Sequence, residues 1–129
     1  LEYLNPAVLY GLTIFTATTG REIVKAVMDI EGDRRYGYVT IPIKYGLEKT
    51  RVLILIHGVT APVLGFLTGF YSNATLAYYT LFTVSSIIYL ASMLKAYVKT
   101  SDKQTLEKTR RRTLYAMLTG LIAYLLIKT

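Results

Sequence analysis

Apolar segments alternate with short polar ones along this chain, and four of them have the composition of membrane-spanning helices. A helix needs roughly 20 residues to cross a bilayer. The first three segments approach or exceed that length, and the fourth is shorter. The pattern therefore predicts an all-α fold, a multi-span transmembrane helical bundle with about four transmembrane helices. The predicted spans cover residues 6–28, 52–70, 76–98 and 113–128.

The polar segments between the spans differ in charge. Residues 21–51 and 95–112 carry nearly all the Lys and Arg of the chain, whereas residues 71–75 carry none. Because positively charged loops of membrane proteins stay on the cytoplasmic side, both basic segments are predicted to be cytoplasmic. We expect residues 29–51 to form a loop on that side.

The composition supports a membrane protein. Hydrophobic residues make up 53% of the 129 residues and charged residues only 18%, below the roughly 25% of soluble domains, and the mean hydropathy is +0.39. The formal net charge of +7 suits either a nucleic acid or an anionic membrane surface. Because the run Arg110–Arg112 directly precedes a span, we interpret it as a topology anchor. We predict an integral protein of the cell membrane that binds no nucleic acid.

Single residues narrow the possibilities further. The chain has no Cys and one His, which excludes a disulfide framework, a thiolate metal site and a His-rich zinc site. We expect His57 to form a hydrogen bond between helices and assign it no catalytic role. Gly65 and Gly69 have the spacing of a face for close helix packing. Ser101 and Gln104 have the capping-box spacing, which predicts that a helix begins there.

The charged residues that follow Gly20 have a helical spacing. Arg21, Lys25, Asp29 and Asp33 recur in four-residue steps, and at about 100° per residue each step drifts by only about 40°. Their side chains are therefore predicted to share one stripe of a helix. Two carboxylates one turn apart suit a hard divalent cation, and the two cations suit a phosphate or diphosphate that the metal also contacts.

A simpler interpretation of the charged stripe is a row of ion pairs. Such pairs are common on helices and stabilise them by only about 0.2–0.5 kcal/mol each. The stripe, however, lies at the cytoplasmic boundary of a predicted span, where ionisable residues are costly and usually functional. We therefore expect a functional site at this boundary.

The residues around the stripe resemble the second aspartate-rich motif of the UbiA superfamily of intramembrane prenyltransferases. Members have nine transmembrane helices around a central cavity, so the resemblance implies that this chain is the last part of a nine-helix UbiA-type fold. It also implies that upstream helices, outside this sequence, carry a first aspartate-rich motif. The similarity consists of RExxK (Arg21, Glu22, Lys25), DIEGD (residues 29–33) and a follow-through with Gly37, Thr40, Pro42 and Gly46.

Within that superfamily, RExxKxxxDIEGD is most similar to the archaeal digeranylgeranylglyceryl phosphate synthase-like members. The resemblance implies Mg²⁺-dependent transfer of an isoprenyl group, expected to be geranylgeranyl, from its diphosphate to a lipid acceptor. The expected acceptor is geranylgeranylglyceryl phosphate, in archaeal membrane lipid biosynthesis. The resemblance further implies an active site on the cytoplasmic side, with the apolar spans lining a groove for the isoprenyl tail.

The resemblance also implies roles for individual residues. Asp29 and Asp33 are expected to bind Mg²⁺ and, together with Lys25, to be catalytic. The residues expected to contact the diphosphate are Arg21, Lys25, Arg34 and Lys44, with Glu22, Glu31 and Thr40 as supporting positions.

Other functions are compatible with a charged stripe at a membrane boundary. A quinone- or chlorophyll-type enzyme of the same superfamily would use an aromatic acceptor. A membrane transporter would use the stripe as an ion path, with charges nearer the middle of a span. An Mg²⁺-dependent alcohol phosphatidyltransferase would require a DGxxAR-like stretch, which this sequence lacks. A purely structural subunit would leave costly charges unused.

Overall fold

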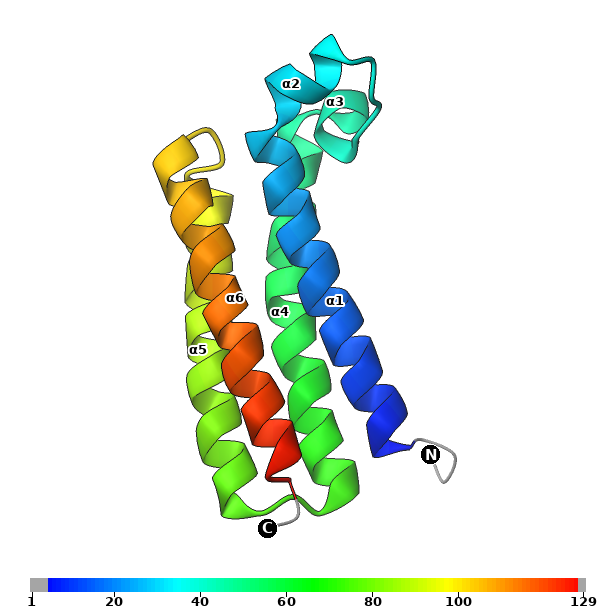
Figure 1. Ribbon diagram of the computed structural model, residues 1–129, viewed down its shortest axis with the longest axis vertical. Helices are drawn as coiled ribbons and strands as arrows, with labels where there is room; N and C mark the ends of the chain where they lie inside the picture. The colour runs from blue at the N-terminus through cyan, green and yellow to red at the C-terminus, as the bar shows by residue number, and fades with distance from the viewer. Residues whose placement is uncertain (1–4, 128–129) are drawn as a thin grey trace.

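The computed structural model describes residues 5–127 and shows four long helices with two short ones at one end (Figure 1). The long helices run alternately up and down (Figure 1). Residues 5–127 contain no strand, so the predicted all-α fold is confirmed. The helices are α1 (Pro6–Met28), α2 (Ile30–Arg35), α3 (Ile41–Tyr45), α4 (Leu47–Ser72), α5 (Leu76–Val98) and α6 (Lys103–Leu125).

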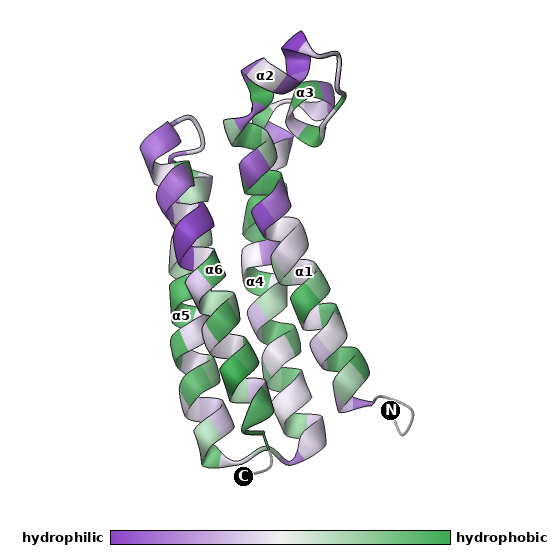
Figure 2. Cartoon of the chain, viewed as in Figure 1, coloured by the Kyte–Doolittle hydropathy of each residue, from purple (hydrophilic) through white to green (hydrophobic). Residues whose placement is uncertain are grey.

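The four long helices form a ring in which each packs on the next. Helix α1 packs on α4, α4 on α5 and α5 on α6, and α6 returns to α1. Two of them, α4 and α5, are long and apolar enough to cross a membrane. The most hydrophilic residues gather at the end of the bundle where α2 and α3 lie (Figure 2). The bundle therefore has one strongly polar end, which carries the predicted stripe.

The ends of α1 and α5 coincide with the predicted spans 6–28 and 76–98. At the start of α1, the side chain of Asn5 accepts a hydrogen bond from the backbone N–H of Ala7 (2.8 Å). Pro6 occupies the first turn, where the backbone N–H that proline lacks would have no partner within the helix. The start of α1 is thus encoded by local sequence.

Helix α6 begins one residue later than the capping-box pattern of Ser101 predicts. The cap is Asp102, whose carboxylate accepts hydrogen bonds from the backbone N–H of Gln104 (3.2 Å) and the hydroxyl of Thr105 (2.7 Å). The bond from Thr105 is the main reason why the pKa of Asp102 is lowered. Residue 128, where the fourth predicted span ends, lies outside the described residues.

Helices α4 and α6 begin earlier than the spans predicted for them, because their charged first turns are helical as well. In α4, Arg51 pairs with Glu48 (3.4 Å). In α6, Arg110 pairs with Glu107 (2.6 Å). Ion pairs at this spacing stabilise a helix where its residues are polar. The apolar pattern predicts only the part of each helix that is suited to the membrane.

The segment 29–51 is not the loop that the sequence predicts. It contains α2, α3 and the first turn of α4. Helix α3 starts with Pro42 in its first turn and packs on α1 and α4. Gly37 and Gly46 separate the helices with φ angles of 80° and 86°, in the left-handed region that favours glycine. The connection is therefore a folded cover at the polar end of the bundle.

Helices α4 and α5 approach each other closely at the two glycines for which the sequence predicts such a contact. A Cβ atom on Gly65 would overlap the ring of Phe82, and one on Gly69 would lie 2.7 Å from Cε1 of Tyr78. Both glycines are buried. The prediction of a small-residue packing face is confirmed.

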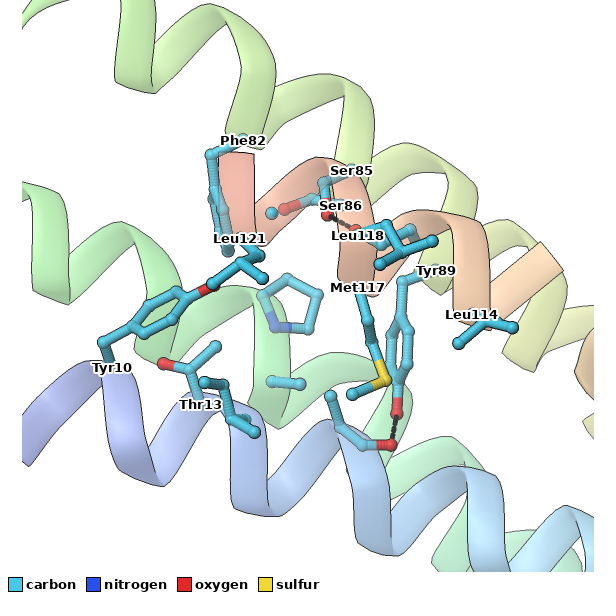
Figure 3. A pocket seen from close by; sticks show the side chains of 16 residues that line it. Tyr10, Thr13, Phe82, Ser85, Ser86, Tyr89, Leu114, Met117, Leu118 and Leu121 are labelled. Carbon is cyan, nitrogen blue, oxygen red and sulfur yellow. Dashed lines mark hydrogen bonds between the residues drawn. The ribbon is translucent and has the colours of Figure 1, made fainter. Parts of the chain in front are cut away.

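Helix α5 also donates one side-chain hydroxyl to each of the other long helices. The hydroxyl of Tyr78 donates to the carbonyl of Gly65 in α4 (2.6 Å). The hydroxyl of Ser85 donates to Ala116 in α6 (2.6 Å), and that of Tyr89 donates to Ala17 in α1 (2.9 Å), as the dashed lines in Figure 3 indicate. Helix α5 is thus hydrogen-bonded to all three of its long neighbours.

A cavity of about 220 Å³ lies between the four long helices. Tyr10, Phe82, Tyr89 and Met117 lie around it (Figure 3). Ser86 also lines it, and its buried hydroxyl has no hydrogen-bond partner in residues 5–127. Small-molecule sites typically enclose about 300–1,000 Å³, so this cavity alone is too small to be the predicted groove for an isoprenyl tail.

We predict that Gly65→Ala lowers the free energy of unfolding by about 1–3 kcal/mol, because the added methyl group overpacks the contact with Phe82. The midpoint of thermal unfolding of the purified protein in detergent measures this effect. Gly11→Ala is the matched control, since a Cβ at Gly11 would meet no atom within 4 Å. It should be neutral or stabilise α1 by up to about 1 kcal/mol. Equal losses in both variants would contradict the close contact.

Candidate functional site

The stripe spans the junction of α1 and α2. Arg21 and Lys25 belong to α1, Asp29 lies between the helices with φ −99° and ψ 12°, and Asp33 belongs to α2. The backbone N–H of Asp29 still donates to the carbonyl of Lys25 (3.0 Å), and that of Asp33 donates to Asp29 (2.8 Å). The four-residue hydrogen-bond spacing therefore continues across the junction. The predicted register of the stripe is kept even though one continuous helix is not.

The side chains of the stripe are not consumed by ion pairs with one another. Within residues 5–127, every ion pair at 4.0 Å or less involves Glu48 or Glu107. Lys25 and Asp29 are exposed, and Asp33 is partly buried. The row of ion pairs considered as the simpler interpretation is therefore absent from the described residues. The carboxylates and the ammonium group remain available to a ligand.

The two aspartates do not by themselves make up a complete metal site. The described residues contain no group of three or more His, Cys, Asp or Glu side chains able to hold a metal ion. Mg²⁺, however, is usually bound through one or two carboxylates plus substrate phosphates and water. Asp29 and Asp33, one turn apart and free of ion pairs, fit such a shared site. They do not fit an all-protein cage.

Arg21 makes contacts that its sequence position does not reveal. Its Nε donates to the hydroxyl of Thr113 (3.2 Å), and its Nη2 donates to the carbonyl of Arg110 (3.3 Å). The guanidinium therefore links α1 to α6. Two of its donors are occupied within the bundle, and contact with a diphosphate would fall to the donors that remain.

Arg110, in the basic part of α6, lies within electrostatic range of Asp29. Arg110 donates two hydrogen bonds to Glu107 (2.6 and 3.3 Å), which is the main reason why the pKa of Arg110 is raised. The negative charge of Asp29 adds a smaller contribution in the same direction. Arg110 therefore belongs to the electrostatic surroundings of the site. Sequence reasoning assigned it only to a topology anchor, because nothing local relates it to Asp29.

The other residues expected to act at the site differ in exposure. Glu22 of α1 is exposed, as are Glu31, Arg34 and Lys44 of the cover. Thr40 is the N-cap residue of α3, but its hydroxyl makes no capping bond, and it is buried without a hydrogen-bond partner in the described part of the chain. Buried hydroxyls are nearly always satisfied. Thr40 is thus a polar group for which the described residues supply no partner.

Gly20 fixes the position of the stripe relative to the bundle. A Cβ at Gly20 would lie 2.6 Å from the hydroxyl oxygen of Tyr89, 2.8 Å from Cε of Met93 and 3.0 Å from Cβ of His57. Helices α1, α4 and α5 therefore converge one residue before Arg21. The sequence shows Gly20 only as the start of the charged segment, whereas the structure makes it a packing position.

The expected role of His57 needs correction. Its Nδ1 lies 2.7 Å from the carbonyl oxygen of Leu53, one turn earlier in the same helix. This hydrogen bond is within α4 and not between helices. A polar side chain on an apolar helix can satisfy itself locally when the preceding turn offers a carbonyl oxygen.

Comparisons with known proteins show what this chain is similar to. A model of the UbiA prenyltransferase family matches residues 2–118. A relative from Methanosphaera stadtmanae, named digeranylgeranylglyceryl phosphate synthase, is 28% identical over 121 residues, which are 94% of this chain and 44% of the relative. A protein of the same name from Methanosarcina mazei is 32% identical over 109 residues, which are 84% of this chain and 36% of that relative.

A solved structure from a study of digeranylgeranylglyceryl phosphate synthase in membranes has the same fold. Its TM-score is 0.86 at 29% sequence identity, and the match covers 95% of this chain and 43% of the solved chain. The predicted transmembrane helical fold is confirmed by this likeness. The chain spans less than half the length of these relatives.

We predict that the contact between Arg21 and Thr113 stabilises the bundle by about 1 kcal/mol, because the bond is charge-assisted but partly solvated. A double-mutant cycle with Arg21→Gln and Thr113→Val, followed by denaturant unfolding in detergent, isolates the coupling free energy. Arg35→Gln removes the same charge from an exposed position and should have little effect on stability. Strict additivity of the two substitutions would contradict the predicted contribution.

Proposed function

Because this chain belongs to the UbiA prenyltransferase family, whose model matches residues 2–118, we propose that the protein transfers an isoprenyl group from its diphosphate to an acceptor. The relatives named digeranylgeranylglyceryl phosphate synthase support geranylgeranyl diphosphate as donor and geranylgeranylglyceryl phosphate as acceptor. The reaction would then be a step of archaeal membrane lipid biosynthesis.

The observation that carries this proposal is the unpaired stripe at one end of the bundle. Lys25, Asp29 and Asp33 have no ion-pair partner in the described residues and keep a one-turn spacing across the α1–α2 junction. A diphosphate with its metal needs carboxylates and cations that are free and close together. If these charges served only to stabilise the helix, they would form ion pairs with one another in the structure.

In the proposed reaction, Asp29 and Asp33 would hold Mg²⁺ together with the diphosphate and the first aspartate-rich motif expected upstream. The ion would supply positive charge that makes the diphosphate a better leaving group. Lys25 neutralises further diphosphate oxygens, and the remaining donors of Arg21 contribute from the α6 side. Arg34 and Lys44 are exposed on the cover and would contact the donor from that side.

The bond that breaks joins the isoprenyl carbon to the diphosphate oxygen, and the electron pair leaves with the diphosphate. The carbon left behind is electron-poor, so it must be shielded from water until the acceptor hydroxyl forms the new C–O bond and releases its proton. Apolar helices supply such shielding, and aromatic ring faces stabilise a nearby cation. The upstream helices complete the enclosure in this proposal.

We propose that this site faces the cytoplasm. The basic segments lie at the same end of the bundle as α2 and α3 (Figure 2), and basic ends of membrane helices remain cytoplasmic. The same distribution disfavours a transporter, since an ion path needs charges in the middle of the spans. The acceptor class, lipid or aromatic, is then decided by assay.

We predict that Asp29→Asn reduces geranylgeranyl transfer at least about 100-fold, because a neutral amide no longer offsets the charge of the metal. The assay uses the protein expressed from its complete gene, radiolabelled geranylgeranyl diphosphate, Mg²⁺ and three acceptors: geranylgeranylglyceryl phosphate, a dihydroxynaphthoate and a hydroxybenzoate. Product should form only with the lipid acceptor and disappear when EDTA removes the metal.

Glu48→Gln is the control, since it removes an exposed carboxylate outside the stripe and should leave the rate within about twofold. Product with an aromatic acceptor alone would reject the lipid assignment and favour the quinone or chlorophyll type. An Asp29→Asn variant with the activity of the wild type would reject the metal role. A wild-type protein that neither binds nor converts the donor would reject the prenyltransferase proposal as a whole.

A further inference from the structure

A second basic site lies between α5 and α6, separate from the stripe on α1. A pocket of about 380 Å³ is lined by residues of these two helices and by Lys99, the C-cap residue of α5. Four of the lining residues are cationic: Lys95 in α5, Lys99 at its C-cap, and Lys108 and Arg112 in α6. The lining contains no acidic residue. The volume falls within the roughly 300–1,000 Å³ of small-molecule sites.

Within residues 5–127, the four cations form no ion pair with a carboxylate. The ion pairs in residues 5–127 involve Arg51, Arg110 and Arg111 and none of the pocket cations. One pocket cation acts on a nearby acid: the positive charge of Lys99 contributes to the lowering of the pKa of Asp102. Its carboxylate, however, caps α6 and is not part of the lining.

The arrangement brings four positive charges together. Lys95 in α5 and Lys99 at its C-cap are four residues apart, and Lys108 and Arg112 are four residues apart in α6. Like charges at this spacing destabilise a helix, and here two such pairs line the same pocket. The bare pocket therefore concentrates positive charge that a bound anion would neutralise.

The basic run of α6 is divided between two faces. Arg110 and Arg111 pair with Glu107, and the carbonyl of Arg110 accepts a hydrogen bond from Arg21 of α1. Lys108 and Arg112 line the pocket with α5 instead. At 100° per residue the two sets point to different sides of the helix. The pocket is therefore distinct from the site that includes Asp29.

The surroundings of the pocket suit a lipid. Thr109 and Ser92 line it, and the hydroxyl of Thr109 donates to the carbonyl of Ser92 (3.1 Å). Leu94 and Val98 also line it and are 42% and 68% exposed, which suits contact with hydrocarbon chains. Basic pockets between transmembrane helices on the cytoplasmic side bind anionic lipid headgroups.

We propose that this pocket binds the phosphate headgroup of an anionic membrane phospholipid, with the lipid chains lying against Leu94 and Val98. The four cations surround the phosphate, and the lipid links the ends of α5 and α6 at the polar end of the bundle. The proposal concerns binding and does not depend on the prenyl transfer proposed for the stripe.

The test uses the full protein, stripped of lipid in detergent and titrated with phosphatidylglycerol, with phosphatidylcholine or with inorganic phosphate. Native mass spectrometry measures the bound lipid, and the thermal unfolding midpoint reports stabilisation. Only phosphatidylglycerol should bind at a saturable site and raise the midpoint. If phosphatidylcholine bound and raised the midpoint as much as phosphatidylglycerol does, the proposal that the pocket recognises a negative charge would be overturned. Equal effects of inorganic phosphate would overturn the assignment to a lipid.

The variant Lys108→Gln/Arg112→Gln should weaken phosphatidylglycerol binding about 25-fold, since each cation near an anionic lipid contributes a factor of about five. Lys103→Gln/Arg111→Gln removes the same charge from α6 outside the pocket and should bind within about twofold of the wild type. Circular dichroism verifies folding. If either variant is unfolded, the pair Lys95→Gln/Lys99→Gln tests the pocket from α5. Equal weakening by pocket and control variants would overturn the site.

Discussion

The hydrogen bonds that α5 donates to its three long neighbours hold the bundle in one arrangement. In a membrane the hydrophobic effect does not drive helices together, so close contact and polar links decide how they pack. Tyr78, Ser85 and Tyr89 each donate to a backbone carbonyl of a different helix. The bond of Tyr78 goes to Gly65, where the ring of Phe82 of α5 occupies the space that a side chain would fill. Close packing and a hydrogen bond between α4 and α5 therefore occur at the same residue.

That arrangement determines where the charged stripe can lie. Tyr89 reaches α1 at Ala17, and its hydroxyl lies against Gly20, one turn further on. The next residue, Arg21, is bonded to α6. Helix α1 is thus held from two sides just before Lys25 and Asp29, which are themselves exposed. A ligand at the stripe would meet side chains that project from a fixed helix end, which is the condition for a preorganised site.

The sequence predicted what depends on local pattern and missed what depends on distant partners. The ends of α1 and α5 follow from apolar periodicity and a capping residue, and Gly65 was identified from its spacing alone. Helix α3 has only five residues, with a proline at its second position and a glycine directly after it, a pattern typical of a loop. The contact of Arg21 with Thr113 joins residues 92 positions apart, and no local rule relates them.

The distribution of cations shows why net charge alone could not assign function. The positive-inside rule treats all basic residues at a helix end alike, and the +7 charge of the chain is compatible with many roles. Partners distinguish them. Arg110 is neutralised by Glu107 and lies near Asp29, whereas Lys108, two residues earlier, lines a pocket without acids. Because a helix turns about 100° per residue, neighbouring cations of one run lie on two faces with different surroundings.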